Sequence, residues 1–236
     1  MTLAADKTRR SLLIGTATAA GWVAATACGS EQRSVHAAAP DSEGEADEEV
    51  STNEDLMREH GVLARLLLVY EAGIARPSLD PTVTATVHRA ADLVSTFIEQ
   101  YHEKLEEDYI FPLLERAGKH VELVRTLRAQ HIAGRAVTQN ILRITGPGSA
   151  IETTELSHSV QAFVRMYRPH ASREDTIVFP ALHRLVSAKQ LRDLGEQFED
   201  VEHQRFGQGG FESIVAQVAE LETALGIADI GQFTPA

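Results

Sequence analysis

One histidine and one glutamate recur at the same spacing in two distant parts of the chain. The stretch YHEKLEEDYIFPLLER (101–116) places Glu106 four residues after His102, and PHASREDTIVFPALHR (169–184) places Glu174 four residues after His170. Of the ten histidines in the chain, these two alone have glutamate at that position. Residues four apart lie on one face of a helix, so each pair can bind one cation together.

A Phe-Pro dipeptide follows both pairs at the same distance, as Phe111-Pro112 and as Phe179-Pro180. Two His-x-x-x-Glu pairs alone would be weak evidence in a chain this rich in acid. The shared Phe-Pro indicates an internal repeat, although it could also be a core turn that ends a helix.

Two further histidines complete the repeat. His60 lies 42 residues before His102, and His131 lies 39 residues before His170. Each half then contributes one histidine from a first helix and a His-x-x-x-Glu pair from a second. Facing halves would gather four imidazoles and two carboxylates: His60, His102, Glu106, His131, His170 and Glu174.

A structural alternative exists for each of these residues, because a lone histidine on an apolar helix is often a packed core residue and a glutamate is often solvated. Burying all six without a cation would be costly, however, since an unpaired buried carboxylate carries a penalty of several kcal/mol. A metal site accounts for the whole pattern.

The ligand set indicates a pair of metal ions. Six ligands exceed a tetrahedral zinc site, and two carboxylates can bridge two ions. Imidazole with carboxylate favours iron, with manganese or zinc as alternatives. The single cysteine, Cys28, excludes iron–sulfur clusters and four-cysteine zinc sites. Ferritin-like bundles use Glu-x-x-His instead, so that fold is disfavoured.

Helices are expected to position these residues. Apolar residues recur at helical intervals and no strand-like alternation interrupts them, so the fold class is all-α. Four long helices are predicted at about 51–74, 81–117, 119–144 and 149–186, with Pro169 bending the last. Short connections favour an up-down-up-down four-helix bundle over 51–186. Two additional helices (188–206 and 210–225) form a C-terminal helical appendage over 187–236.

The first 28 residues read as an export signal. Lys7, Arg9 and Arg10 precede an apolar run that is short for a membrane span. Arg9-Arg10 resembles a twin-arginine signal, and Cys28 after Ala25-Thr26-Ala27 resembles a lipoprotein cleavage box. An ordinary secretory signal is the alternative. Residues 29–50 include six acids in DSEGEADEE (41–49) and are predicted to be a disordered acidic linker.

The two His-x-x-x-Glu pairs, His60, His131 and the two Phe-Pro pairs together resemble the hemerythrin-like HHE cation-binding domain over about residues 52–186. The C-terminal tail is similar to that of a bacterial branch of this family. The resemblance implies a non-heme di-iron centre in a four-helix bundle. It places two iron ions, joined by an oxo or hydroxo bridge, on the six residues named above.

The sequence departs from the oxygen-carrying hemerythrins at one place. Those proteins have a second histidine four residues from the one on the third helix, where this chain has Leu127 and Arg135. One iron should therefore keep an additional open position or take a substitute ligand, and rapid oxidation in air is expected instead of reversible oxygen carriage. Substitute candidates are Glu103, Tyr109 and His203. His88 with Asp92 has no counterpart in the other half and is read as a surface pair.

These features favour a metal-ion binding protein that binds or senses oxygen, nitric oxide or iron outside the cytoplasm, in the periplasm or at the cell surface. The expected ligands are a small diatomic molecule or peroxide, and an enzyme is not expected. One alternative is a di-iron enzyme acting on peroxide, oxygen or nitric oxide; another is an interaction module that a metal stabilises. The net charge of −12 disfavours nucleic acid, and membrane contact is expected only through a lipid at Cys28.

Overall fold

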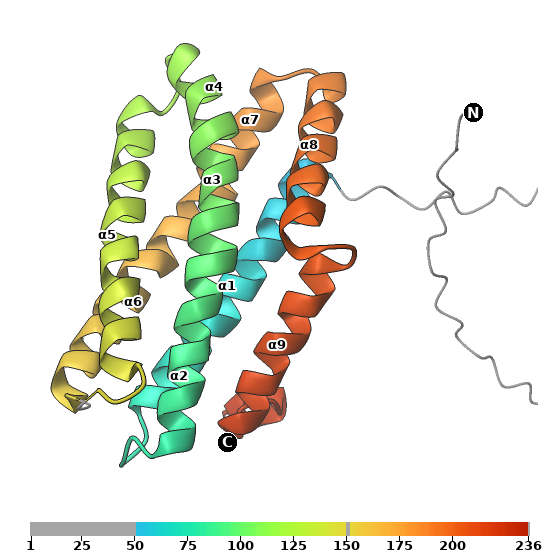
Figure 1. The fold of residues 1–236 in the computed structure, drawn as a ribbon. Coiled ribbons are helices and arrows are strands. Elements are labelled where there is room, and N and C mark those ends of the chain that lie inside the picture. The colour runs from blue at the N-terminus through green and yellow to red at the C-terminus, as the bar shows by residue number, and fades with distance from the viewer. Residues whose placement is uncertain (1–50, 150–151, 236) are drawn as a thin grey trace, which may run out of the picture. The chain divides into compact units, whose positions relative to one another are not determined.

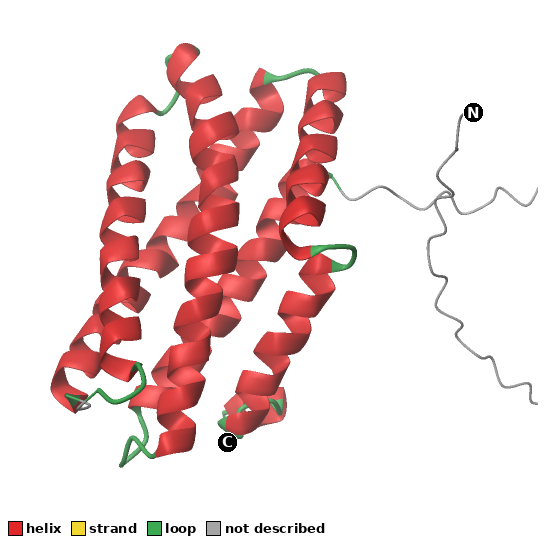
Figure 2. Cartoon of the chain, in the orientation of Figure 1, coloured by secondary structure: helices red, strands yellow, loops and turns green. Residues whose placement is uncertain are grey.

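The computed structural model describes residues 51–149 and 152–235, and within these ranges it contains helices and loops but no strand (Figure 2). The predicted all-α class is confirmed. The predicted export signal, Cys28 and the whole of the predicted acidic linker (29–50) lie outside the described residues. In the described part of the chain, no helix is long and apolar enough to cross a membrane.

Helix α1 (Thr52–Ile74) begins at the predicted cap. The Ser51 hydroxyl accepts a hydrogen bond from the backbone N–H of Glu54 at 3.3 Å, which satisfies one of the free amides of the first turn. The helix buries a row of aliphatic side chains and carries His60 on that same face.

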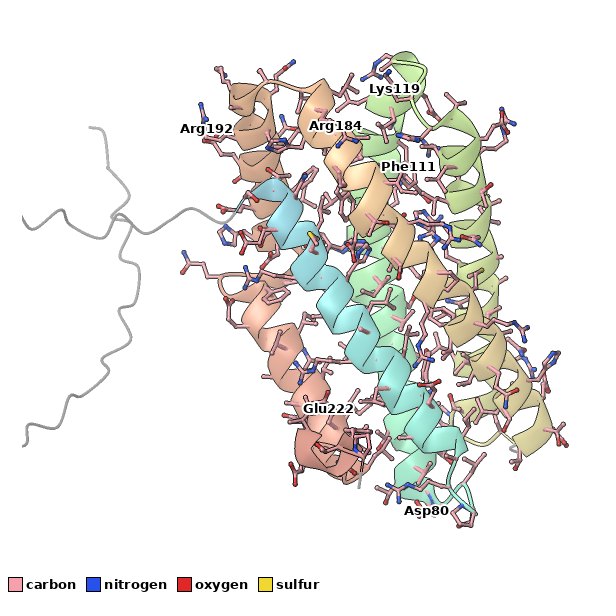
Figure 3. All side chains as sticks on the ribbon, turned by 180° about the vertical axis from the view of Figure 1, so that it is seen from behind. Asp80, Phe111, Lys119, Arg184, Arg192 and Glu222 are labelled. Carbon is pink, nitrogen blue, oxygen red and sulfur yellow. The ribbon has the colours of Figure 1, made fainter. Side chains whose placement is uncertain are left out.

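The second long helix consists of five consecutive segments: α2 (Pro81–Leu93), η1 (Val94–His102), α3 (Glu103–Leu105), η2 (Glu106–Ile110) and α4 (Phe111–Arg116). Asp80 caps its start by accepting from the Val83 N–H at 2.9 Å, and Gly118 follows its end with a φ of 62°. Figure 3 shows Asp80 and Lys119 at opposite ends of the bundle, so this helix spans its full length. Segments η1 and η2 are π-helical, which the sequence pattern did not predict.

The third long helix is α5 (Val121–Thr145), and the fourth joins α6 (Thr153–Arg173), the π-helical η3 (Glu174–Val178) and α7 (Phe179–Leu185). Helix α6 begins later than the predicted position near Ser149. The Ser149 side chain instead donates to the Arg143 carbonyl at 2.8 Å, in the turn that follows α5. Pro169 lies inside α6, and the irregular segment begins only at Glu174.

The four long helices pack in a closed ring around one apolar core. Helix α1 contacts α2 and α6, and α5 also contacts both of these helices (Figure 1). The bundle interior is therefore lined by one face of every long helix, and short connections link neighbours, as the predicted up-down-up-down order requires. Large buried side chains at the centre include Tyr70, Tyr101, Phe163 and Tyr167.

The two additional helices, α8 (Ala188–Phe206) and α9 (Gly210–Ala224), lie against α1 and α2 on the outside of the ring (Figure 1). They extend the apolar core with four buried side chains, Phe198, Ile214, Val218 and Leu221. The Arg65 guanidinium donates to the Glu222 carboxylate at 2.8 and 2.7 Å. A short 3₁₀ turn, η4 (Ile230–Phe233), comes after α9.

Two glycines in the long helices should respond oppositely to alanine. A Cβ at Gly134 would lie 2.1 Å from the Tyr167 hydroxyl oxygen, whereas a Cβ at Gly61 would meet no atom within 4 Å. We expect Gly134→Ala to lower the free energy of unfolding by about 1–3 kcal/mol through overpacking. Gly61→Ala should raise it by about 0.5–1 kcal/mol through helix propensity. Denaturant midpoints test this, and equal stability of the two variants would contradict the packing at Gly134.

Candidate metal centre

Four imidazoles from four different long helices meet at the middle of the bundle. His60 comes from α1, His102 from the end of η1, His131 from α5 and His170 from α6. They form two pairs whose Nε2 atoms face each other: 3.0 Å separates those of His60 and His102, and 3.1 Å those of His131 and His170. All four side chains are buried.

Two fully buried carboxylates connect the histidine pairs. Glu106 has one oxygen 3.7 Å from His102 Nε2 and the other 3.5 Å from His131 Nε2. Glu174 has one oxygen 3.4 Å from His60 Nε2 and the other 3.1 Å from His170 Nε2. Each carboxylate therefore faces both pairs, one oxygen to each. The structure thus brings together all six residues that the sequence pattern singled out.

Two of the three π-helical segments in the described part of the chain, η2 and η3, begin at the repeated glutamates. Glu106 is the first residue of η2, and Glu174 is the first residue of η3. A π segment adds one residue to a turn and rotates the later part of the helix about its axis, and such segments are frequent at functional sites. After both segments the chain returns to an α-helix at Phe111-Pro112 and at Phe179-Pro180, where each proline lies in the first turn and its missing N–H is tolerated.

The repeated phenylalanines cover the histidines of the neighbouring helices. The Phe179 ring stacks on His60 with centroids 5.5 Å apart, and the Phe111 ring stacks on His131 at 5.6 Å. Figure 3 shows Phe111 on the second long helix, with α5 alongside it. Each Phe-Pro thus helps to fix one imidazole plane, which accounts for the repetition of the dipeptide together with the His-x-x-x-Glu pair.

Every imidazole Nδ1 has a hydrogen-bond acceptor on the side away from the centre. The His102 Nδ1 lies 2.6 Å from Glu59 and the His60 Nδ1 2.7 Å from Asp175. The remaining two lie 3.1 Å from Glu107, for His131, and 2.9 Å from Gln130, for His170. These acceptors favour the tautomer that donates from Nδ1, in which a neutral ring directs its Nε2 lone pair inward, the arrangement found around metal-bound histidines.

Sequence reasoning missed these four acceptors. All four are adjacent to a predicted residue: Glu59 to His60, Glu107 to Glu106, Gln130 to His131 and Asp175 to Glu174. Each nevertheless serves a histidine on another helix, so adjacency alone could not reveal the pairing.

Burial and charge shape the protonation of the centre. Burial raises the pKa of Glu106 well above its usual value, and the nearby Glu174 carboxylate raises it further. Burial lowers the pKa of His131 to about 4, although its contact with Glu107 opposes that shift. Burial also lowers the pKa of His102 well below its ordinary value. His131 and His102 are therefore neutral near pH 7 and have a free lone pair.

The two glutamates of the centre are buried without the hydrogen-bond donors that normally compensate a carboxylate. All four carboxylate oxygens of Glu106 and Glu174 are buried without a hydrogen-bond donor. Burial lowers the pKa of His60, but its contacts with Asp175 and Glu174 raise it overall to about 9. A neutral imidazole whose proton lies on Nδ1 offers these oxygens no donor. Among the described residues, three groups of donor atoms, the atoms of each within 4.8 Å of one another, could hold a metal ion, and two of them lie at this centre: one from His60, His102 and Glu106, the other from Glu106, His131, His170 and Glu174. The residues present fit two cations that share carboxylates.

The structure separates the candidate substitute ligands. Glu103 is buried beside His131, with one oxygen 4.0 Å from His131 Nδ1 on the outer side of that ring, and it also forms part of a possible metal-binding group with Glu107 and His131. Tyr109 packs against Phe198 with ring centroids 5.5 Å apart, and His203 is exposed on α8. Neither Tyr109 nor His203 therefore reaches the inward-facing Nε2 atoms.

The positions of the missing histidine carry no nitrogen donor toward the centre. Leu127 is part of the apolar core, and Arg135 pairs with Glu103 at 2.8 Å and with Glu107 at 2.7 Å. His88 contacts Asp92 at 3.7 Å and Thr145 at 2.9 Å, and it belongs to none of the metal-binding groups among the described residues.

Comparison with known proteins agrees with this geometry. The profile of the Hemerythrin HHE cation binding domain matches residues 51–182. The chain is 45% identical over 231 residues to proteins of Mycobacterium tuberculosis and Mycobacterium bovis, which are described as uncharacterized; the match covers 96% of this chain and 91% of theirs. No solved structure matches. The chain belongs to the hemerythrin HHE cation-binding domain family.

Proposed function

We propose that the chain is a non-heme di-iron binding protein that binds or senses a small diatomic ligand or peroxide. The observation that carries this proposal is the pair of buried glutamates whose four oxygens lack hydrogen-bond partners while four imidazole Nε2 atoms face them. His60 and His102 would hold one ion, His131 and His170 the other, and Glu106 and Glu174 would be shared. Nitrogen and carboxylate donors suit iron, and manganese is the nearest alternative.

The bound irons would supply Lewis acidity and one-electron redox chemistry. The protein's own contribution is to fix the donors before the metal arrives. Glu59, Asp175, Glu107 and Gln130 hold the Nδ1 protons, and Phe111 and Phe179 hold two of the ring planes. Because the donors are already oriented, metal binding needs little rearrangement of the core.

Two features favour a small ligand: the number of metal-coordinating atoms, and a cavity that reaches His60. Four nitrogens and four shared carboxylate oxygens do not fill two octahedral coordination spheres, and neither Leu127 nor Arg135 adds a donor. A cavity of about 630 Å³ lies between α1 and α6, and His60 and Asp175 are among its lining residues. We therefore favour ligand binding or sensing over enzymatic turnover.

The proposed location is outside the cytoplasm. It rests on the basic and apolar first 28 residues, with Arg9-Arg10 and Cys28, and on the acidic segment after them. A lipid at Cys28 would tether the bundle to a membrane surface through that segment.

Metal content should depend on the repeated face. His102→Ala combined with Glu106→Ala removes a nitrogen and a shared carboxylate, so bound iron should fall from two per chain to less than one. His88→Ala is the matched control and should keep two irons, because His88 contacts Thr145 and Asp92 instead. Elemental analysis of purified protein measures both. Two irons in the double variant would place the site elsewhere.

Ligand binding should alter the visible spectrum. Adding nitric oxide to the reduced iron protein, or hydrogen peroxide to the oxidised protein, should change its absorption bands, because open coordination positions admit these molecules. Zinc-loaded protein is the control and should show no visible band. Iron-loaded protein whose spectrum ignores both reagents would favour the alternative in which the metal only stabilises the fold.

Export should need the arginine pair. Replacing Arg9 and Arg10 with lysine keeps the charge but removes the twin-arginine signature, so the variant should remain in the cytoplasm. Cell fractionation with immunodetection measures this, and normal export would favour the general secretory route. Cys28→Ser should abolish labelling by palmitate, and labelling that persists would end the lipoprotein proposal.

A further inference from the structure

One buried tyrosine lies beside the centre and has no role in holding metal. Tyr167 on α6 is 1% exposed, and its hydroxyl donates to a Glu103 carboxylate oxygen at 2.5 Å. Its ring lies 5.2 Å from the His170 ring, centroid to centroid. The tyrosine is therefore in contact with an imidazole of the centre on one side and with a proton acceptor on the other.

The fold makes room for this hydroxyl at a cost. The Tyr167 hydroxyl occupies the space that a Cβ at position 134 would need, so the middle of α5 carries glycine, a poor helix former. The other Glu103 oxygen pairs with Arg135 at 2.8 Å, which keeps the carboxylate in place. If Tyr167 served only to fill space, a phenylalanine would do so equally well, and no buried glutamate would need to face the hydroxyl.

Aromatic rings continue from Tyr167 along the core. Phe163 stacks on Tyr167 with centroids 4.3 Å apart, and Tyr70 meets Phe163 edge-on at 5.6 Å. The series His170, Tyr167, Phe163 and Tyr70 is in contact throughout, and Tyr70 is also fully buried. Such contact gives an electron or hole a short path through the bundle.

We propose that Tyr167 is an oxidisable side chain, which gives one electron to the centre when hydrogen peroxide reacts there while its phenolic proton moves to Glu103. This inference rests on the proposed iron centre. The Tyr167 O–H bond breaks and an O–H bond forms on Glu103, leaving a neutral tyrosyl radical. One electron from Tyr167 and one from a ferrous ion, which becomes ferric, reduce one peroxide to two waters. The two protons required are the phenolic proton, passed on through Glu103, and one from solvent.

The other described tyrosines lack this combination of contacts. Tyr109 is only partly buried and packs on Phe198, and the Tyr70 hydroxyl has no hydrogen-bond partner. Tyr101 shares a hydrogen bond with Glu59, but its ring packs on Phe97 and Phe206 and not on an imidazole of the centre. Tyr109 is therefore the matched control for a Tyr→Phe substitution.

The test is electron paramagnetic resonance of iron-loaded protein that is reduced by one electron per centre, so that each centre holds a single ferrous ion, then mixed with hydrogen peroxide and rapidly frozen. Wild-type protein should show a radical signal that narrows when the protein contains ring-deuterated tyrosine. Tyr167→Phe should lose the signal, and Tyr109→Phe should keep it. Glu103→Gln, which retains a hydrogen-bond acceptor but cannot take the proton as a carboxylate does, should lower the radical yield. Zinc-loaded protein should form no radical.

Iron content and helical content are measured for each variant alongside the spectrum. A radical of undiminished size in Tyr167→Phe, or no tyrosyl radical in wild-type protein that holds two irons, would overturn the role of Tyr167 and leave the iron centre intact. Should Tyr167→Phe fail to fold, an unchanged radical yield in Glu103→Gln would overturn the proposal instead. If the wild-type protein binds no iron when iron is supplied, both proposals are overturned, because the electron from Tyr167 then has no acceptor.

Discussion

The burial of two glutamates against four inward-facing imidazole Nε2 atoms is the constraint on which the rest of the structure depends. Removing a carboxylate from water costs several kcal/mol unless a donor or a cation compensates. Here Glu106 and Glu174 are 0% exposed and lack donors, and the imidazole protons point outward to other acceptors. Bound metal would resolve this imbalance, and the bundle presents nitrogen and carboxylate donors at one place.

The surrounding elements reflect that requirement. The two glutamates each begin a π-helical segment, and a Phe-Pro comes after each segment, so the two halves of the site are nearly equivalent in construction. The two halves differ in the residues that accept hydrogen bonds from the imidazole Nδ1 atoms. Asp175 and Glu59 back the His60–His102 pair, whereas Glu107 and the neutral Gln130 back the other. Glu103, Arg135 and Tyr167 are also found only beside that second pair, which makes the two metal positions chemically unequal.

The sequence was informative where a local pattern controls the geometry. Spacing of four residues predicted which side chains share a face, and helix caps such as Ser51 and Asp80 predicted where helices begin. The π segments could not be predicted, because they depend on how a buried glutamate is accommodated by three other helices. Three hydrogen bonds of the site, His60 to Asp175, His170 to Gln130 and Tyr167 to Glu103, join residues 40 to 115 positions apart. No local sequence pattern encodes such pairs.

The central claim is that six side chains hold two iron ions, and crystals of the iron-loaded protein test it most directly. Anomalous difference maps calculated from data on either side of the iron absorption edge locate iron without reference to the rest of the structure. The account predicts two peaks, one beside the Nε2 atoms of His60 and His102 and the other beside those of His131 and His170, with Glu106 and Glu174 reaching both. A single peak, or peaks away from these residues, would contradict it.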